Sequence, residues 1–394
     1  MIFQTLDDKQ DCIGIYHDGS ILHDSLPDDL SGTWRYTQYL NDRNIEYANL
    51  YCNGKKSQEV CPDHLKDDFD KMTKKFKAYL RSFQLGRISL NDHCFYDLVP
   101  ESFLLEYFEL KNQITQHVLS TYEKPANYDF LLDLTKVVTD IGHRKLNVDL
   151  NFGRHTIVSK KGKEAFSKYK KYQPYCKYDI FGTKTGRLIN IPGSFPILTM
   201  DKDFRKIVQP TNDWFVELDY NGAELRTFLA LSDKEQPKAD IHAWNAKYIF
   251  NNCSRDEAKN RIFAWLYNPQ SHHMEAEKVY NRIMVKQRYW DGERVKTPYG
   301  RDIAATEHYA LSYIIQSTLS DTVLRQMIKV HKLLENRKSH IAFSVHDSIV
   351  LDMTDDEKFL IPTIKEVFAL NDLDTFEVSV KGGKNFGSLH KLRL

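Results

Sequence analysis

The chain has 394 residues, 41% of them hydrophobic and 12% aromatic, which is enough for two or three packed units rather than one. Its formal net charge of +1 excludes a strong overall field that would drive it to nucleic acid or to a membrane surface. No apolar run is long enough to span a bilayer, and the first residues, MIFQTLDDKQDC, lack a basic and then apolar signal.

The six cysteines show no close pairing and no Cys-x-x-Cys motif. A zinc site or a disulfide scaffold is therefore not expected, and a reducing compartment is favoured. Together with the absence of a membrane signal, this predicts a soluble, cytoplasmic protein that has no membrane partner.

The first 100 residues are of mixed pattern. The stretch CIGIYHDGSILHD predicts a hairpin with Asp18-Gly19 as its turn, and DHLKDDFDKMTKKFKAYLRSF predicts a charged helix. From residue 101 the apolar residues keep helical spacing, and they do so again after Pro125, which predicts two long helices, expected as an antiparallel pair.

A lysine-rich segment with interleaved tyrosines follows. Its lysines and tyrosines are Lys160, Lys161, Lys163, Lys168, Lys170, Lys171, Lys177, Tyr169, Tyr172, Tyr175 and Tyr178. Lysines mixed with aromatic residues suit a phosphate backbone, but such runs are more often a solvated face, and the sequence leaves both open.

The stretch DWFVELDYNGAELRTFLALS begins as an apolar strand that ends at Asp219. Asn221-Gly222 turns the chain, and a helix follows. An Asp at a strand end often only caps the next helix, so Asp219 alone does not indicate a site.

Ser254 starts another helix, with Glu257 in the capping-box position. Four residues recur on one face of it at every fourth position: Arg255, Lys259, Phe263 and Tyr267. This stripe fits cations that hold a triphosphate and aromatic rings that cover a base, to which His242 would add a phosphate donor. The alternative is a surface helix that packs through its apolar residues.

The stretch AFSVHDSIVLDM alternates as two strands around His346-Asp347-Ser348. Asp347 is either an ordinary turn residue or a metal ligand at the tip of a rigid hairpin. With Asp219 as a second carboxylate, a shared site for Mg²⁺ becomes plausible, because Mg²⁺ prefers one or two carboxylates plus phosphate oxygens. A helix near 357–369 and a final strand and loop in FEVSVKGGKNFGSL complete the chain.

Between about residues 183 and 390 the chain resembles the polymerase portion of the family A DNA polymerases, the bacterial polymerase I type also found in phages. The segments that carry the resemblance are, in order, TKTGRL, DYNGAELR, DIHAWNA, RDEAKNRIFAWLY, YIIQSTLSD, VHDS and KGGKNFGSL. Any one of them is a weak signal, but their shared order and spacing are specific.

The resemblance implies an α+β right-hand polymerase with an antiparallel palm sheet, fingers and a thumb. Its implied parts are an N-terminal region of unknown role (1–100), a thumb-like helical pair (101–150), the first part of the palm with the Lys/Tyr segment (151–235), the fingers (236–296) and the second part of the palm with the catalytic hairpin (297–394).

The resemblance also implies residue roles. Asp219 and Asp347 would bind two Mg²⁺ ions together with the backbone carbonyl of Tyr220, and Glu224 would close off the sugar 2′ position. Lys259 would act in catalysis and nucleotide binding. The remaining nucleotide-binding residues would be Arg255, Phe263, Tyr267 and His242, and the DNA-binding residues would be Thr183, Arg187, Gln316 and His346.

The implied activity is template-directed extension of a primer 3′ end with dNTPs by nucleotidyl transfer, with primer–template DNA and dNTPs as partners. Ser348 stands where the family normally has Glu, which puts rate and metal preference in doubt. No convincing Asp-x-Glu pattern for exonuclease metals occurs before residue 180, so proofreading is expected to be absent, and a separate exonuclease or a processivity factor is an expected partner.

Two rival readings stay open. A single-subunit RNA polymerase would share the palm and both aspartates, but Glu224 argues against it because its side chain would clash with a ribose 2′-OH. A catalytically inactive DNA-binding accessory subunit is disfavoured by the presence of Asp219, Lys259 and Asp347 together.

Overall fold

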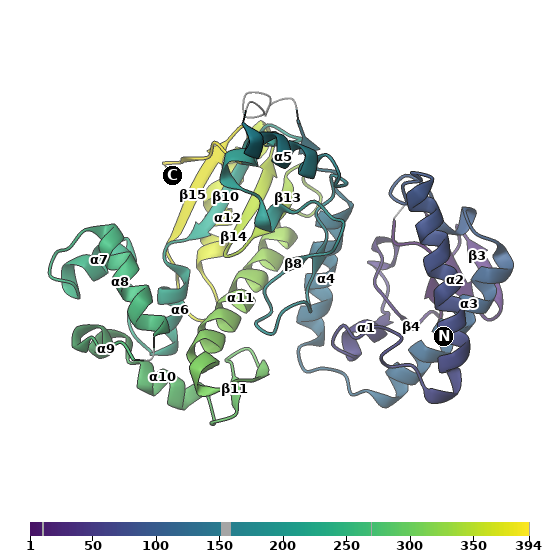
Figure 1. Cartoon of the computed structure of the whole chain (residues 1–394), viewed down its shortest axis with the longest axis horizontal. Helices are drawn as coiled ribbons and strands as arrows, with labels where there is room; N and C mark the ends of the chain where they lie inside the picture. The colour runs from purple at the N-terminus through teal and green to yellow at the C-terminus, as the bar shows by residue number, and fades with distance from the viewer. Residues whose placement is uncertain (10–11, 151–158, 269, 394) are drawn as a thin grey trace. The chain divides into compact units, whose positions relative to one another are not determined.

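The computed structural model describes residues 1–9, 12–150, 159–268 and 270–393. They divide into two units, Met1–Asp140 and Ile141–Leu394 (Figure 1). The first unit therefore joins the predicted N-terminal region with most of the predicted helical pair, and the boundary falls inside one helix. The first eight residues of the predicted 151–235 part lie outside the described residues.

The first unit opens with a small antiparallel sheet. Strand β1 (Gln4–Thr5) pairs with β2 (Gly14–His17), which pairs with β3 (Ser20–His23). Asp18 and Gly19 both have positive φ, 44° and 73°, as a two-residue hairpin turn with the twist of its strands requires. The predicted hairpin is confirmed.

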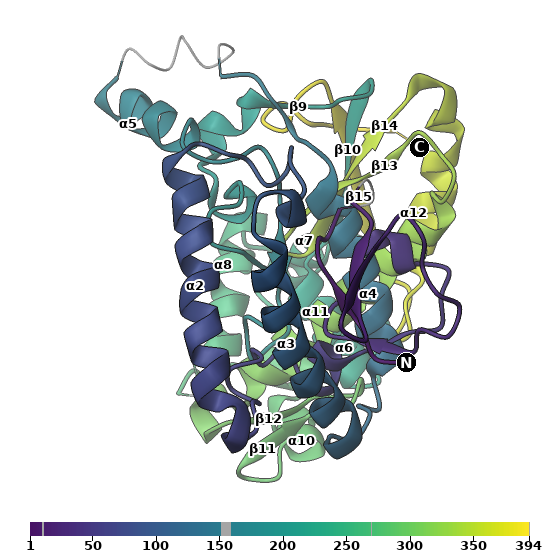
Figure 2. The ribbon, with the colours of Figure 1, turned by 90° about the vertical axis from the view of Figure 1, so that its right-hand side faces the viewer.

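The helices of the first unit are α1 (Ala48–Tyr51), α2 (Lys66–Leu85), α3 (Glu101–Thr121) and α4 (Tyr128–His143), with the short parallel strands β4 (Gly32–Thr33) and β5 (Glu46–Tyr47) before them. The sequence predicted α2 as a charged helix and α3 and α4 from their apolar spacing, and it made no prediction for α1. Helix α3 packs against α1 and α2. Helices α2 and α3 are seen next to each other in Figure 2. The rings of Phe76 and Tyr107 stack between α2 and α3, with their centroids 5.0 Å apart.

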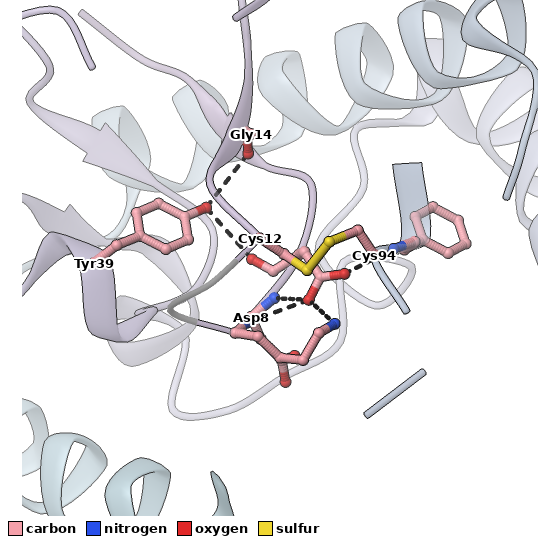
Figure 3. Close-up of a disulfide and its surroundings, with 8 residues drawn as sticks. Asp8, Cys12, Gly14, Tyr39 and Cys94 are labelled. Atoms are coloured by element: carbon pink, nitrogen blue, oxygen red, sulfur yellow. Dashed lines mark hydrogen bonds and ion pairs between the residues drawn. A yellow bond between two sulfur atoms is a disulfide. The ribbon is translucent and has the colours of Figure 1, made fainter. Parts of the chain in front are cut away.

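The sequence analysis expected no disulfide scaffold, and for this unit that prediction is wrong. Cys12 and Cys94 form a disulfide with their Cα atoms 5.6 Å apart (Figure 3). No local sequence pattern indicates this pair, because 82 positions separate the two cysteines and only the folding of the unit brings them together. Cys52, Cys61, Cys176 and Cys253 are free thiols.

The second unit is built on a five-stranded antiparallel sheet in the order β13–β14–β10–β15–β16 (Figure 1). The strands are β10 (Trp214–Tyr220), β13 (His340–Val345), β14 (Ser348–Met353), β15 (Val378–Gly383) and β16 (His390–Lys391). The predicted mixture of helices with an antiparallel sheet is confirmed.

Helices cover and extend this sheet. The long helix α11 (Glu307–Leu333) packs against α6 (Ala223–Leu231) and α12 (Ile361–Ala369), and α12 also contacts β10 and β15. The helices α7 (Ile241–Tyr248), α8 (Arg255–Tyr267), α9 (Met274–Tyr280) and α10 (Arg282–Tyr289) lie together beside α6, at lower left in Figure 1.

These helices share a buried apolar core. Trp265 is 2% exposed in it, with its ring near that of Tyr280 and the Arg282 guanidinium 4.3 Å from the ring centroid. The large side chain thus has its own packing partners and does not open the helix bundle.

The Lys/Tyr segment forms α5 (Lys160–Tyr169) and the chain after it. Two of its tyrosines belong to the core: Tyr169 is 4% exposed, and Tyr178 is 5% exposed with its hydroxyl donating to the carbonyl of Ser344 at 2.6 Å. Lys161 pairs with Asp201 at 2.7 Å. These two rings therefore stabilise the fold and are not free to stack on bases.

The remaining short strands are β6 (Asn147–Val148), β7 (Tyr178–Asp179), β8 (Ile189–Asn190), β9 (Val208–Gln209), β11 (Arg294–Lys296) and β12 (Asp302–Ala304). None of the helices in the described ranges has the length and apolarity that a membrane crossing requires.

Candidate active site

The two predicted aspartates meet at one end of the large sheet. Strand β10 lies in the middle of the sheet, and Asp219, its next-to-last residue, pairs with Ser348 of β14 on one side and with Ser379 of β15 on the other. Asp347 immediately precedes Ser348 in the two-residue turn between β13 and β14, where His346 has a φ of 54°. Asp347 is therefore a turn residue and also a neighbour of Asp219, so the two interpretations that the sequence left open for Asp347 are compatible.

The electrostatics bear out this proximity. Burial raises the pKa of Asp219 to about 6, the positive charges of Lys381 and Lys259 oppose the rise, and the negative charges of Glu217 and Asp347 add to it. Burial also raises the pKa of Asp347, with Arg187 opposing and Glu224 adding. Two partly desolvated carboxylates with raised pKa values form a place where a cation is favoured.

Sequence reasoning missed two of these charges, Lys381 and Glu217. They face each other across β10 and β15, and the Lys381 ammonium lies 2.6 Å from the Glu217 carboxylate. Glu217 and Asp219 are two residues apart on one strand and share a face. The alternation of side chains along β10 could have predicted that Glu217 lies on the same face as Asp219. The pairing of β15 with β10, which brings Lys381 to Glu217, could not be predicted from the sequence.

Two residues beside the aspartates turn their side chains away. The Ser348 hydroxyl is buried and donates to the carbonyl of Val345 at 2.9 Å, so it belongs to the hairpin. The Tyr220 ring stacks on Phe368, and its hydroxyl donates to the Phe368 carbonyl at 2.6 Å. Tyr220 therefore has only backbone atoms to offer to the site.

The turn after β10 positions Glu224. Gly222 has a φ of 62°, which a residue with a side chain rarely adopts, and a Cβ there would meet Ile241 at 2.2 Å. Helix α6 begins directly after it, with Glu224 in the first turn. The Glu224 carboxylate pairs with Arg187 at 3.3 Å, so the predicted sugar-facing and primer-facing residues are in contact.

Helix α8 presents the predicted stripe. Ser254 caps it by accepting from the N–H of Glu257 at 3.2 Å. The rings of Phe263 and Tyr267 are parallel within 3°, with centroids 6.3 Å apart, and Lys259 is exposed.

The stripe reaches the rest of the site at Tyr267. Burial is the main cause that raises the Tyr267 pKa, and the charge of Glu224 adds to it, whereas Gln316 and Arg187 oppose it. The Tyr267 hydroxyl makes no hydrogen bond of normal geometry within the described part of the chain. The effects of Glu224 and Gln316 on its pKa place both side chains near this hydroxyl.

Arg255 is held at the start of α8 by Asp240, with a guanidinium to carboxylate distance of 2.8 Å. Asp240 also accepts from the side-chain amide of Asn221 at 2.7 Å and from the backbone N–H groups of His242 and Ala243. One carboxylate thus ties the turn after β10, the start of α7 and the start of α8 together.

His242, predicted as a phosphate donor, lies buried at the start of α7. Its ring is 4% exposed, and burial lowers its pKa to about 4 while the cations of Arg255 and Lys259 lower it further, against the effect of Asp240. The ring is therefore neutral at neutral pH, so it would serve a phosphate as a neutral donor and not as a cation.

The predicted DNA-contacting residues lie on different elements. Thr183 donates to the carbonyl of Arg187 at 2.9 Å, which shapes the TKTGRL loop. Gln316 lies on α11, and His346 is exposed at the tip of the β13–β14 hairpin. The structure brings Arg187 to the carboxylates through Glu224, and Gln316 to the stripe through Tyr267.

Comparisons with known proteins agree with this geometry. No protein-family model matches the chain. The chain is 26% identical to DNA polymerase I of Chloroflexus aurantiacus over 46% of its length, and 26% identical to the thermostable DNA polymerase I of Thermus aquaticus over 45% of its length. The alignments cover 25% and 28% of those relatives, so the chain spans about a quarter of their length.

A solved structure shows the same fold across the chain. It is described as the POL domain of Pol1 from M. smegmatis in complex with DNA primer-template and dNTP. It is 11% identical in sequence, has a TM-score of 0.68, and covers 98% of this chain and 95% of its own. The resemblance to the DNA polymerase I type that the motifs predicted is therefore confirmed by these relatives, and the solved structure shares the fold.

Proposed function

We propose that the chain is a template-directed DNA polymerase that extends a primer 3′ end with dNTPs. The observation that carries this proposal is the meeting of Asp219 and Asp347 at the end of β10, beside Glu224 and the α8 stripe. Its relatives at 26% identity are named DNA polymerase I, and the solved structure of similar fold holds primer-template and dNTP.

The residues present fit a divalent cation. Asp219 and Asp347 supply hard oxygen ligands, and burial makes both carboxylates unfavourable as bare anions. Mg²⁺ is the expected ion, with the Tyr220 carbonyl as a further ligand. A divalent cation bound there supplies charge stabilisation to the reacting phosphate and lowers the pKa of an attacking hydroxyl.

The chain's own residues would do the rest. Lys259 is exposed on the stripe, where it would hold the triphosphate with Arg255, and Phe263 and Tyr267 would cover the incoming base. Arg187, Gln316, Thr183 and His346 would contact primer–template DNA. Fixing the substrate in line with the 3′ hydroxyl contributes most of the rate in phosphoryl transfer, where little covalent chemistry falls to the protein.

Several further assignments belong to this proposal. Residues 151–235 and 297–394 would form the palm, 236–296 the fingers and 101–150 the thumb. The chain would work in the cytoplasm, with a separately encoded exonuclease or a processivity factor as partner. The phage-type character stays a prediction.

Primer extension tests the proposal. With Mg²⁺ and a recessed template, the purified chain should add dNTPs in template order and should use rNTPs far less. Asp219→Ala and Asp347→Ala should abolish extension while binding of the primer–template in a mobility-shift assay persists. DNA binding without extension by the unaltered chain would favour an inactive accessory subunit, and efficient use of rNTPs would favour an RNA polymerase.

A further inference from the structure

The turn between β11 and β12 holds an arginine against the TKTGRL loop of the same unit. In this turn the Arg301 N–H donates to the Thr297 hydroxyl at 3.1 Å, and the Thr297 N–H donates to the Arg301 carbonyl at 3.0 Å. Gly300, just before Arg301, has a φ of 80°. Thr297 therefore fixes the Arg301 backbone at both its N–H and its carbonyl.

A buried acid on α11 fixes the Arg301 side chain. The Arg301 Nε and Nη2 atoms lie 2.6 and 2.7 Å from the two carboxylate oxygens of Asp321, which is 2% exposed. Burial raises the pKa of Asp321, and the hydrogen bonds and charge of Arg301 and the charge of Arg325 oppose the rise. A pair with two parallel hydrogen bonds sets the plane of the guanidinium as well as its position.

The Arg301 guanidinium lies directly over Gly186. A Cβ on Gly186 would meet the Nη2, Cζ and Nη1 atoms at 2.2, 2.3 and 2.8 Å, so the flat face of the guanidinium covers the glycine. A flexible arginine would move aside for a larger residue, but the pair with Asp321 holds this one in place. Gly186 also has a φ of 76°, which a residue with a side chain rarely adopts.

Gly186 immediately precedes Arg187, so the place of the glycine decides where the Arg187 side chain can reach. The Arg187 guanidinium lies 3.3 Å from Glu224 at the candidate active site. Thr183 closes the loop, since its carbonyl accepts from the Gly186 N–H at 3.3 Å and its hydroxyl donates to the Arg187 carbonyl at 2.9 Å. A misplacement of about 1 Å in an active site can cost about 10²-fold in rate.

We propose that Arg301, held by Asp321, is a positioning residue that fixes the TKTGRL loop and thereby directs Arg187 to the primer–template. The inference rests on the proposed function at one point, the contact of Arg187 with DNA. It adds that this contact depends on the β11–β12 turn and on α11, which lie far from the loop in the sequence.

The simpler alternative is that the Arg301–Asp321 pair only joins the β11–β12 hairpin to α11. Arg301→Lys separates the two, because lysine keeps the charge and lacks the planar fork that covers Gly186. A merely structural pair predicts a lower melting temperature and unchanged DNA binding by the folded protein. A positioning pair predicts that the loss of binding is specific to Arg187.

A double-mutant cycle on primer–template binding tests the proposal. Fluorescence anisotropy of a labelled primer–template, without dNTPs, should show binding weakened by about 10–100-fold in Arg187→Ala, as for one charge-assisted hydrogen bond. Arg301→Lys should weaken binding by about tenfold in the unaltered chain. It should weaken binding no further in Arg187→Ala, because residues that act through one contact are not additive.

Arg294→Lys is the matched control. Arg294 lies on the same hairpin, and its Nε is 2.6 Å from an Asp302 carboxylate oxygen, but this pair stays within the hairpin and its side chains are 46% and 48% exposed. The control should leave primer–template binding unchanged.

A second variant guards against misfolding. Removing one partner of a buried pair is strongly destabilising, whereas replacing both by apolar residues is often neutral. Arg301→Met/Asp321→Leu should therefore keep the melting temperature and still bind primer–template as weakly as Arg301→Lys. Binding as tight as that of the unaltered chain would overturn the proposal.

Hydrogen exchange read by mass spectrometry gives a measurement without DNA. Arg301→Lys should speed exchange of the backbone amides in residues 183–188 and leave peptides from β10 unchanged, because only the loop loses its support. Unchanged exchange in the loop, or an equal increase across the second unit, overturns the proposal.

Primer extension by the unaltered chain separates failure of this inference from failure of the proposed function. Binding of primer–template without extension counts against the polymerase proposal and leaves the cycle readable. Unaltered DNA binding in Arg187→Ala, or an equal effect of Arg301→Lys with and without Arg187, overturns the inference even where extension succeeds.

Discussion

At the scale of single residues, Ser348 shows how close to the carboxylates a side chain can lie without serving them. It pairs with Asp219 across the strands, but its hydroxyl donates to the Val345 carbonyl. Ser348→Ala should therefore cost about 1 kcal/mol of unfolding free energy, as for one lost hydrogen bond, and leave single-nucleotide turnover close to normal. A turnover loss as large as that of Asp347→Ala would mean that the hydroxyl acts in the reaction.

Glu224 is expected to control the choice of sugar. Its ion pair with Arg187 fixes the carboxylate near the Tyr267 hydroxyl. A ribose 2′-OH would meet this side chain and lose water without gaining a good partner, and exclusion of this kind can reach about 10⁴-fold. Glu224→Ala should raise the use of rNTPs relative to dNTPs in single-nucleotide kinetics.

Glu224→Gln is the matched control, because it keeps the size of the side chain and removes its charge. Exclusion by size predicts that the sugar preference survives in Glu224→Gln and falls in Glu224→Ala. An unchanged ratio in both variants would mean that Glu224 is only a favourable acid in the first turn of α6, worth about 0.3–1 kcal/mol.

At the scale of elements, Asp240 connects the site to the helices. Burial alone would raise its pKa, but hydrogen bonds from Arg255, Asn221 and the backbone hold the pKa well below its usual range. A carboxyl with a lowered pKa stabilises the fold above its unfolded pKa of about 3.9 and loses that contribution as the pH falls.

Asp240→Asn should keep the cap of α7 but lose the pairing with Arg255. We expect a lower unfolding free energy at neutral pH, by about 0.5–2 kcal/mol, and a difference from the unaltered chain that shrinks below about pH 4. Denaturant unfolding at several pH values measures this. A difference that stays constant down to acidic pH would show that the Asp240 charge does not contribute.

The disulfide acts on the elements of the first unit. It joins the segment before β2 to the segment before α3. Closing a loop with 82 positions between its ends restricts the unfolded chain and stabilises the fold by about 2–4 kcal/mol. Cys12→Ser/Cys94→Ser should lower the melting temperature under oxidising conditions, and a reductant should lower that of the unaltered chain but not of the variant. Equal melting temperatures in all four cases would mean that the disulfide does not form in solution.

At the scale of the whole molecule, we expect the chain to extend primers without editing them. The purified protein should not shorten a mismatched 3′ end in the presence of Mg²⁺, which gel analysis of a labelled primer would detect. Degradation that survives Asp219→Ala would reveal a nuclease site before residue 180 that the sequence analysis missed.

The features of the fold and of the site that could be predicted are those whose sequence pattern lies within a short stretch of the chain. Strand β10, the Asn221-Gly222 turn and the β13–β14 hairpin were predicted because alternation and turn residues lie within a few positions of one another. The pair of Lys381 with Glu217 was missed because 164 positions separate its members. The Cys12–Cys94 bond was missed for the same reason, and the burial that neutralises His242 depends on packing that no local pattern encodes.

The Cys12–Cys94 bond also makes part of the chain a covalent ring. The segment after α2 lies inside that ring, and Arg87 in it is exposed with a φ of 57°. A single tryptic cut after Arg87 would therefore leave both fragments attached. The nicked protein should run as one band on a non-reducing gel and as two bands after reduction, so an intact band alone would not show that the backbone is uncut.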